Sequence, residues 1–391
     1  MPHSGRKPIC SVAKDGDIAK AVYRALSRIE LPDLNGKKIL LKPNAGRKVG
    51  KNLGINTSPD VVKAVYDCLR GTYRAQFFLG DSPITGVVSR EAFLSSGYES
   101  LMDHEDITYV DLDSRKPLTL KIPSGKILKH VKVTGYLDDF DYIVSIPVLK
   151  MHMHTGATLS VKNMKGLIYK KEKVKLHQLH CDEKIRQGYK ELDIAIADLS
   201  GALAPDLAII DAYYAMEGMG PSAGDRVKMN TIVASTDYLA ADLTALAIAG
   251  LTIDHVPHLK LISERINKIV SFEDVETIPA DISPFVTELK PAPRDIKINN
   301  CKVNLLDFGS CSACLYSLFQ FLDKNEPVVQ KYFAAYGQLN FAVGKDIPDP
   351  PGDTFLLGNC SIHRKKQGVF IKGCPPTQSS IKELVEQKCK R

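Results

Sequence analysis

We predict from the sequence an α/β fold with a mixed, largely parallel sheet, a β-rich insertion and a smaller C-terminal α/β domain. Three observations predict this fold. Apolar runs of strand length alternate with helical patterns, short β runs interrupt the alternation at residues 107–150, and a proline-rich stretch at residues 278–293 separates two parts. Because such a stretch is typical of a linker, we expect one domain over residues 1–285 and a second over residues 286–391.

The first elements alternate between strand and helix. Residues 38–41 and 75–79 are short apolar runs typical of strands, and residues 59–69 between them carry a helical pattern. This alternation favours a parallel sheet, because parallel neighbours need a crossover that a helix usually supplies.

Residues 107–150 are expected to form an antiparallel insertion. Ser124-Gly125 and Thr134-Gly135 mark turns between short β runs, and an apolar strand follows at 142–147. The alternation then resumes with a helix at 189–203, strands at 207–210 and 231–234, and a helix at 237–249. In the C-terminal domain we expect strands at 302–306, 339–343, 355–357 and 369–371, a helix after Cys311, and a final helix at 379–387.

The composition is that of an ordinary globular protein, with 44% hydrophobic and 25% charged residues. The N-terminus lacks the apolar run of a secretory signal, and no stretch has the roughly 18–20 apolar residues that cross a bilayer. We therefore expect a cytoplasmic protein without a membrane partner. The net charge of +7 is modest, and no basic patch with interleaved aromatic residues stands out, so nucleic acid is not an expected partner.

Nine cysteines, an odd number with several clustered toward the C-terminus, favour ligation over a secreted disulfide framework. The ligand candidates occur as Cys311-x-x-Cys314, as Cys360 after a Gly-Asn pair, and as Cys374 between a glycine and two prolines. These cysteines follow predicted strands. Because the ends of parallel strands share one edge of a sheet, cysteines that are distant in sequence can meet there.

Four thiolates are the ligand set that iron-sulfur clusters require. The glycines beside Cys360 and Cys374 leave room for a bulky group, and backbone N–H groups in such turns hydrogen-bond its sulfides. We therefore expect an iron-sulfur cluster, 4Fe-4S above all, on Cys311, Cys314, Cys360 and Cys374. The alternatives are a structural zinc ion on the same four thiolates, and cysteines that are simply buried.

Reactive side chains concentrate directly after the strand that ends at Pro147. This is the carboxyl end of the strand, and α/β enzymes hold their sites at the carboxyl ends of their strands. We expect four of them to be catalytic, namely Lys150, His152, Lys162 and Asn163. The expected substrate-binding residues are Lys42, Asn44, Asp81, Thr158, Lys165, Glu217, Gly218 and Gly220. The lysines between residues 162 and 175 suit either an anion-binding loop or a solvated basic loop.

A glycine-rich turn at residues 217–224 would bring backbone N–H groups to an anion, or serve as a plain structural turn. It fits neither the Walker pattern nor the dinucleotide pattern, so the sequence indicates neither ATP nor NAD. His177 and His180, three residues apart, would share a helical face and suit a divalent metal. Loop or interface histidines are the alternative for this pair.

Several motifs of the N-terminal domain together resemble the family called domain of unknown function 362. They are LKPN at 41–44, NTSPD at 56–60, GDS at 80–82, IPVLKMH at 146–152, TLSVKNMKG at 158–166, DAYYAMEGMGPSAG at 211–224 and STD at 235–237. Members of this family are often attached to iron-sulfur modules, so the resemblance implies redox work. The C-terminal segment departs from the closely spaced cysteine pattern of ferredoxins, which favours a single cluster with dispersed ligands.

These features favour an enzyme, an iron-sulfur oxidoreductase that acts on a small anionic substrate or relays electrons. One alternative is a non-redox lyase or isomerase in which the cluster is structural or acts as a Lewis acid. The other is a carrier of electrons or metal for a larger partner. Besides a small anionic molecule, the partners that the sequence leaves open are a redox protein and a second copy of the chain.

Overall fold

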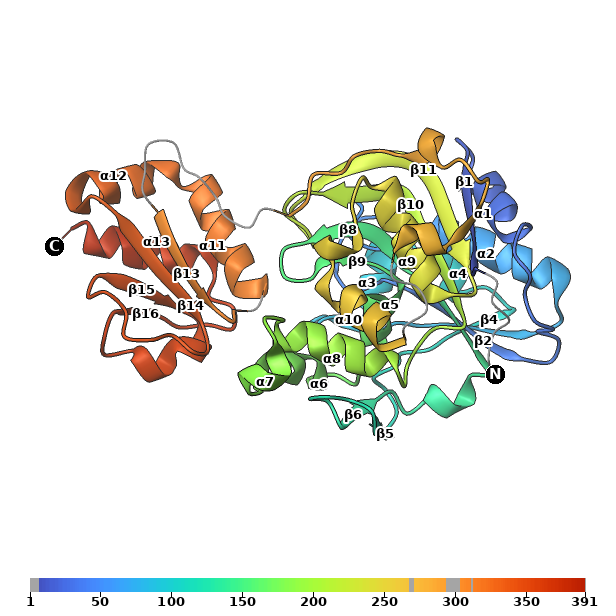
Figure 1. The fold of residues 1–391 in the computed structure, drawn as a ribbon, viewed down its shortest axis with the longest axis horizontal. Helices are drawn as coiled ribbons and strands as arrows, with labels where there is room; N and C mark the ends of the chain where they lie inside the picture. The colour runs from blue at the N-terminus through green and yellow to red at the C-terminus, as the bar shows by residue number, and fades with distance from the viewer. Residues whose placement is uncertain (1–6, 267–270, 293–302, 311, 391) are drawn as a thin grey trace. The chain divides into compact units, whose positions relative to one another are not determined.

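The computed structural model describes residues 7–266, 271–292, 303–310 and 312–390 (Figure 1). The chain divides into two compact units, Met1–Pro291 and Ala292–Arg391. Among the described residues, no helix is both long enough and apolar enough to cross a membrane.

The first unit is built on a ten-stranded sheet whose strands follow the order β12-β1-β11-β10-β7-β2-β3-β4. Beside this row, β8 pairs with β10 and β9 pairs with β8. The strands are β1 (Ile9–Lys14), β2 (Lys38–Pro43), β3 (Gln76–Leu79), β4 (Ile107–Tyr109), β7 (Tyr142–Ile146), β8 (Val148–His152), β9 (Gly156–Thr158), β10 (Leu207–Glu217), β11 (Asp225–Ser235) and β12 (Glu276–Ile278).

Most of the strand pairs in this sheet are parallel. β2 pairs in parallel with β3 and β7, β3 with β4, β10 with β7 and β8, and β1 with β12. The antiparallel pairs are β1 with β11, β10 with β11 and β8 with β9. The mixed, largely parallel sheet that the sequence predicts is confirmed.

The region expected to be an antiparallel insertion, residues 107–150, is divided between two structures. β4 and β7 belong to the main sheet and pair there in parallel, whereas β5 (Leu118–Lys121) and β6 (His130–Val133) form a separate antiparallel pair. Short apolar runs indicate that strands are present. They do not indicate the partners, because a three-residue strand such as β4 has too few residues to show which neighbour it pairs with.

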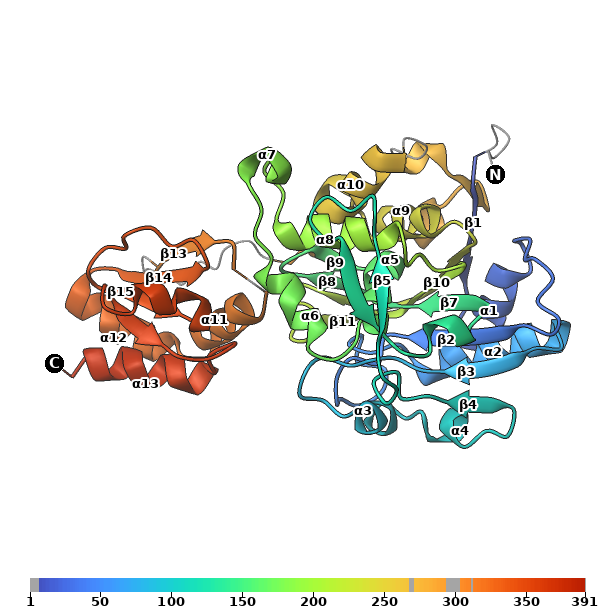
Figure 2. The ribbon, with the colours of Figure 1, turned by 90° about the horizontal axis from the view of Figure 1, so that it is seen from below.

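Helices cover both faces of the main sheet (Figures 1 and 2). On one face, α1 (Ile18–Leu26) and α2 (Pro59–Thr72) share a core with alternate strand residues such as Ile39 and Leu41. The opposite face carries α5 (Ser160–Asn163), α8 (Glu191–Ser200), α9 (Tyr238–Ile248) and α10 (Pro257–Ile266). Because side chains alternate between the two faces of a strand, the buried Leu40 belongs to this second layer.

The remaining helical segments of the first unit are short. They are α3 (Ser89–Ser95), η1 (Leu137–Asp139), α4 (Glu99–Met102), η2 (Met164–Leu167), α6 (Glu172–Lys175), η3 (Leu176–Gln178), α7 (Glu183–Arg186), η4 (Ile253–His255), η5 (Phe272–Asp274) and η6 (Ser283–Phe285). α9 begins where the side chain of Asp237 caps the helix by accepting hydrogen bonds from the N–H groups of Leu239 and Ala240.

The second unit contains a four-stranded, fully parallel sheet in the order β13-β14-β15-β16. Its strands are β13 (Val303–Phe308), β14 (Leu339–Gly344), β15 (Thr354–Leu357) and β16 (Val369–Ile371), and its helices are α11 (Ser312–Lys324), α12 (Glu326–Tyr336), η7 (Asn359–Arg364) and α13 (Gln378–Lys388). All six residues of β14 are buried, as is usual for an inner strand of a parallel sheet. The predicted smaller α/β domain is confirmed.

Candidate functional site

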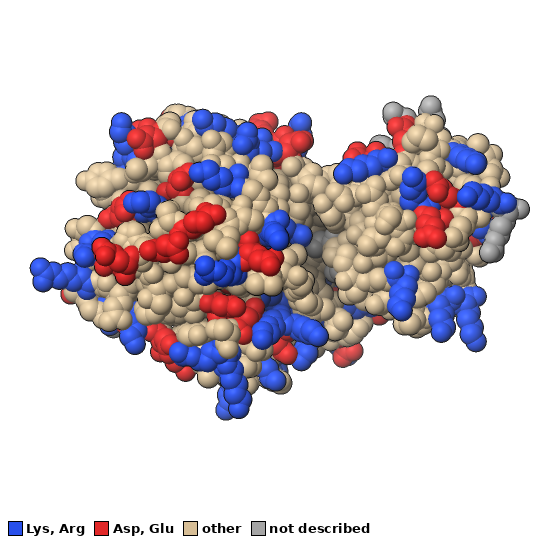
Figure 3. Space-filling view, turned by 180° about the vertical axis from the view of Figure 1, so that it is seen from behind, with Lys and Arg blue, Asp and Glu red and all other residues tan. Residues whose placement is uncertain are grey.

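On the surface of the protein, basic and acidic side chains are interspersed over the face that Figure 3 shows. Inside the first unit the charges are distributed differently, because several lysines gather around the β8–β9 hairpin and the helices that follow it. Lys150 lies opposite Thr158 across the two strands, and His152 lies opposite Gly156. Opposite residues and residues two apart share one face of a sheet, so Lys150, His152 and Thr158 face the same side.

Lys150 is buried and has only neutral hydrogen-bond partners within the described residues. Its Nζ donates to Asn44 Oδ1 at 2.6 Å and to the main-chain oxygen of Ile55 at 2.5 Å. Burial, with a smaller contribution from the charge of Arg47, lowers the pKa of Lys150 to about 7. This amine therefore exchanges a proton near neutral pH.

Lys162 on α5 and Lys165 on η2 complete a group that we call the lysine cluster, defined as Lys150, Lys162 and Lys165. Lys162 Nζ donates to Thr158 Oγ1 at 3.2 Å, and both Lys162 and Lys165 remain partly exposed. Burial and the charge of Lys165 hold the pKa of Lys162 well below its ordinary value, and burial followed by the charge of Lys173 lowers the pKa of Lys165 to about 8. Among the described residues, no member of the cluster forms an ion pair.

His152 is held as a neutral imidazole. Burial, followed by the charge of Lys162, holds the pKa of His152 well below its ordinary value. The main-chain N–H of His154 donates to His152 Nδ1 at 3.2 Å, which places the ring proton on Nε2. His154 itself lies in the turn after β8, where its ring packs edge-on against that of His177 with the ring centroids 6.0 Å apart.

A second buried lysine, Lys42 at the end of β2, has a complete set of partners. Lys42 Nζ donates to Asp81 Oδ1 at 2.8 Å and to Asn163 Oδ1 at 3.1 Å. Asn163 Nδ2 donates to the main-chain oxygen of Lys42 at 3.1 Å and to Ser145 Oγ at 3.0 Å. Asp81 Oδ2 accepts from the N–H of Ala45 at 2.8 Å. This arrangement favours a structural role for three residues to which the sequence assigns catalysis or substrate binding, Lys42, Asp81 and Asn163.

Gly166 makes room for this network. A Cβ atom at position 166 would lie 1.9 Å from Asp81 Oδ1 and 2.5 Å from Lys42 Nζ. No side chain fits at that distance, so glycine is required where η2 closes over the ion pair. The network thereby fixes η2, which carries Lys165.

The glycine-rich turn after β10 lies beside the end of β8, where Met153 N–H donates to the main-chain oxygen of Gly220 at 3.2 Å. The N–H groups of its two predicted binding glycines are already used, because Gly218 donates to the main-chain oxygen of Lys290 at 2.8 Å and Gly220 donates to that of Gly218 at 2.7 Å. Glu217 belongs to β10 and accepts from the N–H of Lys290 at 2.9 Å. A structural role for this turn is therefore favoured over an anion-binding one.

Asp193 and His258 are two buried residues near the lysine cluster that the sequence analysis did not single out. Asp193 lies on α8 and His258 on α10, with Asp193 Oδ1 and His258 Nδ1 3.6 Å apart. The carboxylate of Asp193 acts to raise the pKa of both Lys162 and Lys165. The available signal was a charged residue inside an otherwise apolar helical segment, which is rare unless the residue has a partner.

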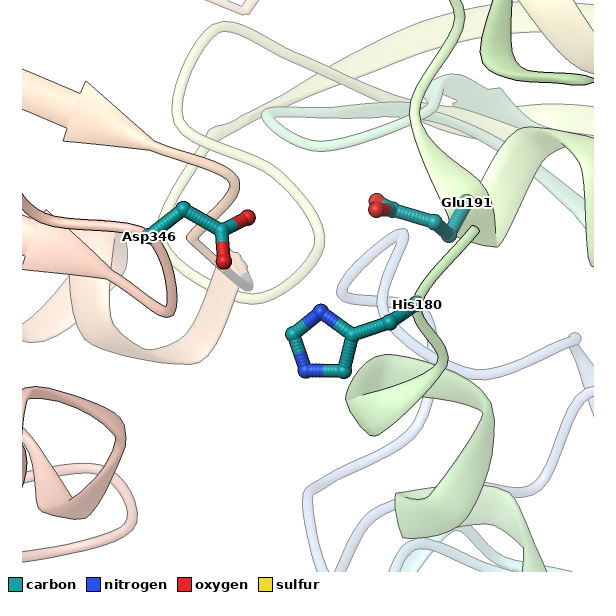
Figure 4. A group of neighbouring side chains, drawn as sticks. All are labelled: His180, Glu191 and Asp346. Atoms are coloured by element: carbon teal, nitrogen blue, oxygen red, sulfur yellow. The ribbon is translucent and has the colours of Figure 1, made fainter. Parts of the chain in front are cut away.

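His177 and His180 do not share a helical face, because His177 lies in η3 and His180 in the segment that follows. A ring nitrogen of His180 and a carboxylate oxygen of Glu191 lie within 4.8 Å of each other (Figure 4). Asp346, which Figure 4 also labels, belongs to the second unit, so the first unit offers two ligands here. Two ligands alone are fewer than protein zinc sites use.

In the second unit, three of the four candidate ligand cysteines lie beyond the carboxyl ends of its strands. Cys314 follows β13, Cys360 follows β15 and Cys374 follows β16, while Cys311 lies outside the described residues. Two hydrogen bonds join the segments of Cys360 and Cys374, from Asn359 N–H to Gly373 O at 2.8 Å and from Gly373 N–H to Asn359 Oδ1 at 3.0 Å. Cys314, Cys360 and Cys374 therefore each follow a strand of the same parallel sheet, and the prediction that four cysteines share one bound group stays a prediction.

Cys314 also reaches the segment of Cys360. A Cβ atom at Gly358 would lie 3.0 Å from Cys314 Sγ and 3.6 Å from the main-chain oxygen of Gly373. Gly358, with a φ of 86°, is thus the residue around which the three cysteine segments converge. The donor set and this glycine fit a thiolate-bound group at the edge of the sheet.

The comparisons with known proteins place the first unit in a family. The family model described as "Domain of unknown function (DUF362)" matches residues 39–247. The thylakoid-associated protein sll1697 of Synechocystis is 30% identical over 283 residues, which is 70% of this chain and 79% of that protein.

Two solved structures are similar at a lower level. The apoprotein of lactate racemase from Thermoanaerobacterium thermosaccharolyticum has a TM-score of 0.40, and a Thermotoga maritima protein has a TM-score of 0.33, each at 14% identity. The matches cover 64% and 63% of this chain, and the chain spans 59% and 58% of those structures. At these TM-scores and identities, neither likeness indicates a shared activity.

Proposed function

We propose that this chain is an iron-sulfur oxidoreductase that binds a small anionic molecule at its lysine cluster. The chain belongs to the family named domain of unknown function 362. The observation that carries the proposal is the lysine cluster. The charges of Lys150 and Lys165 lie close enough to lower the pKa of Lys162, and within the described residues none of the three has an ion-pair partner.

An anion is the ligand that such a group binds. Burial disfavours each ammonium charge, and the neighbouring lysines add mutual repulsion. A carboxylate or phosphate group at the cluster relieves both effects, because it supplies the opposite charge and accepts several hydrogen bonds at once. Lys162 and Lys165 are partly exposed, so a small molecule reaches them from solvent.

Two further groups suit proton transfer to the bound molecule. Lys150 has a pKa of about 7, where it serves as a base or an acid near neutral pH. His152 is neutral and carries its proton on Nε2, so it donates a hydrogen bond to the ligand without adding charge. Asn44 holds Lys150 in place through its Oδ1.

The redox part of the proposal rests on the second unit. Cys314, Cys360 and Cys374, with Cys311, would hold an iron-sulfur cluster beyond the strand ends, and Gly358 leaves room beside the thiolates. When bound, such a cluster supplies one-electron transfer. A structural zinc ion on the same thiolates is the alternative occupant.

One observation favours a second candidate, a non-redox lyase or isomerase. Lys150 and the neutral His152 together suit the removal of a proton beside a carboxylate or carbonyl group, a step that needs no electron transfer. In such an enzyme the cysteine-bound group would be structural or a Lewis acid.

The cofactor is tested by anaerobic purification with iron, sulfide and zinc assays, and by electron paramagnetic resonance before and after dithionite. We expect about four irons and four sulfides for each chain, and a signal that appears on reduction. Cys374→Ser should remove the chromophore, whereas Cys68→Ser on α2 should leave it intact. Stoichiometric zinc without iron would contradict the cluster, and a cluster that dithionite does not reduce would favour the lyase or isomerase.

The anion site is tested by isothermal titration of the purified chain with inorganic phosphate and with succinate. We expect binding of at least one of these probes, and its loss in Lys162→Met. Lys63→Met is the matched control, because Lys63 is an exposed lysine that pairs with Asp67 on α2. Binding that survives Lys162→Met, or that Lys63→Met removes equally, would contradict the site.

A further inference from the structure

A span of the second unit between Asp353 and Glu383 carries only one sign of charge. It contains no acidic residue, and it contains the candidate ligands Cys360 and Cys374. Its basic residues are Arg364, Lys365, Lys366, Lys372 and Lys382. Because a surface with one sign of charge attracts molecules of the opposite sign, this span favours an acidic partner.

Three exposed lysines of this span lie next to the two cysteine segments. Lys365 and Lys366 follow directly on η7, and the N–H of Lys365 donates to the main-chain oxygen of Ile362 at 3.2 Å. Lys372 follows β16. Because β15 and β16 are neighbouring parallel strands, Lys372 lies beside the segment that leads from β15 into η7.

The three lysines carry positive charge that no acidic side chain balances by contact. Within the described residues, none of them forms an ion pair. Arg364 differs from them, because its guanidinium pairs with Asp349 Oδ1 at 2.5 Å and donates to the main-chain oxygen of Ile347 at 2.9 Å. Exposed lysines are common on proteins, so their meaning depends on the groups that lie beside them.

An apolar side chain and an exposed thiol lie in the same two segments. Ile362 is 53% exposed, against 39% for Tyr336, the other large apolar side chain that is exposed in the described part of the second unit. Cys374 is exposed, and Cys360 is partly exposed. Two residues of a 3-10 helix rise about 4 Å, so Ile362 lies close to Cys360 along η7. A protein that covers Ile362 therefore comes close to the thiolates.

We propose a docking surface for an acidic electron-transfer protein, made of Ile362, Lys365, Lys366 and Lys372. The inference rests on the proposed iron-sulfur function and adds the kind of partner that exchanges electrons with it. Apolar side chains of the partner cover Ile362, and its carboxylates meet the lysines at the rim. One electron leaves the reduced metal centre of the partner, which is oxidised, and reduces the thiolate-bound group. No bond forms or breaks.

The docking surface is tested by titrating the purified chain with an acidic plant-type ferredoxin. Titration calorimetry measures the affinity at about 20 mM and at about 300 mM salt, because salt screens exposed charges. We expect the affinity to fall about tenfold or more between these two conditions. This measurement reports binding and requires no electron transfer.

Charge reversal at the lysines locates the binding. We expect the double variant Lys365→Glu, Lys366→Glu to weaken ferredoxin binding about tenfold or more at low salt, because attraction becomes repulsion. The matched control is Lys324→Glu, Lys331→Glu, which changes the net charge equally at exposed lysines of α11 and α12. The control should weaken binding about twofold or less. Circular dichroism checks that both variants are folded.

A variant at Ile362 tests the apolar centre. We expect Ile362→Ser to weaken ferredoxin binding about fivefold at both salt concentrations, because salt does not screen an apolar contact. In stopped-flow measurements at low salt, reduced ferredoxin should reduce the Lys365, Lys366 double variant more slowly than the wild-type protein. Iron and sulfide assays on the same preparations check that the cluster content is equal.

The inference is overturned if ferredoxin does not bind at low salt, or if the control variant weakens binding as much as the Lys365, Lys366 variant does. An oligonucleotide that binds the same lysines more tightly than ferredoxin would replace the acidic protein with nucleic acid. If the lysine variant loses ferredoxin but the purified chain holds zinc without iron, the iron-sulfur function fails and the docking surface stands. If the chain holds iron and sulfide but the lysine variant binds ferredoxin normally, the docking surface fails and the iron-sulfur function stands.

Discussion

Lys42 and the lysine cluster, both in the first unit, differ in how their charges are balanced. Lys42 has a carboxylate and an amide within hydrogen-bond distance and is fully enclosed. In the lysine cluster, Lys150 donates to neutral oxygens and Lys162 donates to a hydroxyl. A buried cation with complete partners serves the fold, whereas a group of cations without a counter-charge in hydrogen-bond contact indicates a place for an anion.

The largest effect that tests this comparison concerns Lys42. We expect Lys42→Met to lower the free energy of unfolding of the first unit by about 3–5 kcal/mol, because Asp81 is left buried without its cation. Urea unfolding followed by circular dichroism measures the change. Lys165→Met is the control and should change the stability by about 1 kcal/mol or less. If both variants lowered the free energy of unfolding equally, the distinction between Lys42 and the lysine cluster would be contradicted.

The second effect concerns ligand affinity. We expect Lys150→Met to weaken phosphate or succinate binding by about 1.5–3 kcal/mol, the range for a hydrogen bond to a charged group. Its effect on stability should be smaller than that of Lys42→Met, because Lys150 donates only to neutral oxygens and no buried carboxylate is left without its cation. Titration calorimetry and urea unfolding on the same preparation give both values. Unchanged affinity would remove Lys150 from the anion site.

The third effect concerns the glycine that closes over the Lys42 network. We expect Gly166→Ala to lower the free energy of unfolding by about 1–3 kcal/mol, because the added methyl overlaps Asp81 and Lys42. Gly71→Ala on α2 is the control, since nothing lies within 4 Å of a Cβ there and alanine favours a helix. A Gly166→Ala protein with the wild-type free energy of unfolding would show that the side chains of Asp81 and Lys42 move aside at little cost.

The smallest effect is the pH dependence of anion binding. Lys150 has a pKa of about 7 and Lys165 of about 8, and a bound anion raises both because it favours the charged form. Binding therefore takes up protons above pH 7, and the affinity should fall as the pH rises through 7 to 8. The fall is at most about tenfold per pH unit for each proton. An affinity that rises over this range would contradict the assignment.

The sequence determined several features of this protein by itself. Apolar runs at 38–41 and 339–343 indicated the inner strands β2 and β14, because burial on both faces of a parallel sheet demands continuous apolar side chains. Lys150 and His152 stay predicted site residues, proposed because they come directly after a predicted strand. The cysteines stay predicted ligands, proposed because of their clustered spacing, their positions after strands and the glycines beside two of them.

Only the tertiary structure decided which of the polar residues are satisfied. Lys42, Asp81 and Asn163 come from β2, from the end of β3 and from α5, so their mutual contacts are absent from any local pattern. Asp193 and His258 meet because α8 packs beside α10. Whether a buried charge is structural or is held for a ligand depends on partners distant in sequence, because hydrogen bonds and Coulomb forces act over distances in space and not along the chain.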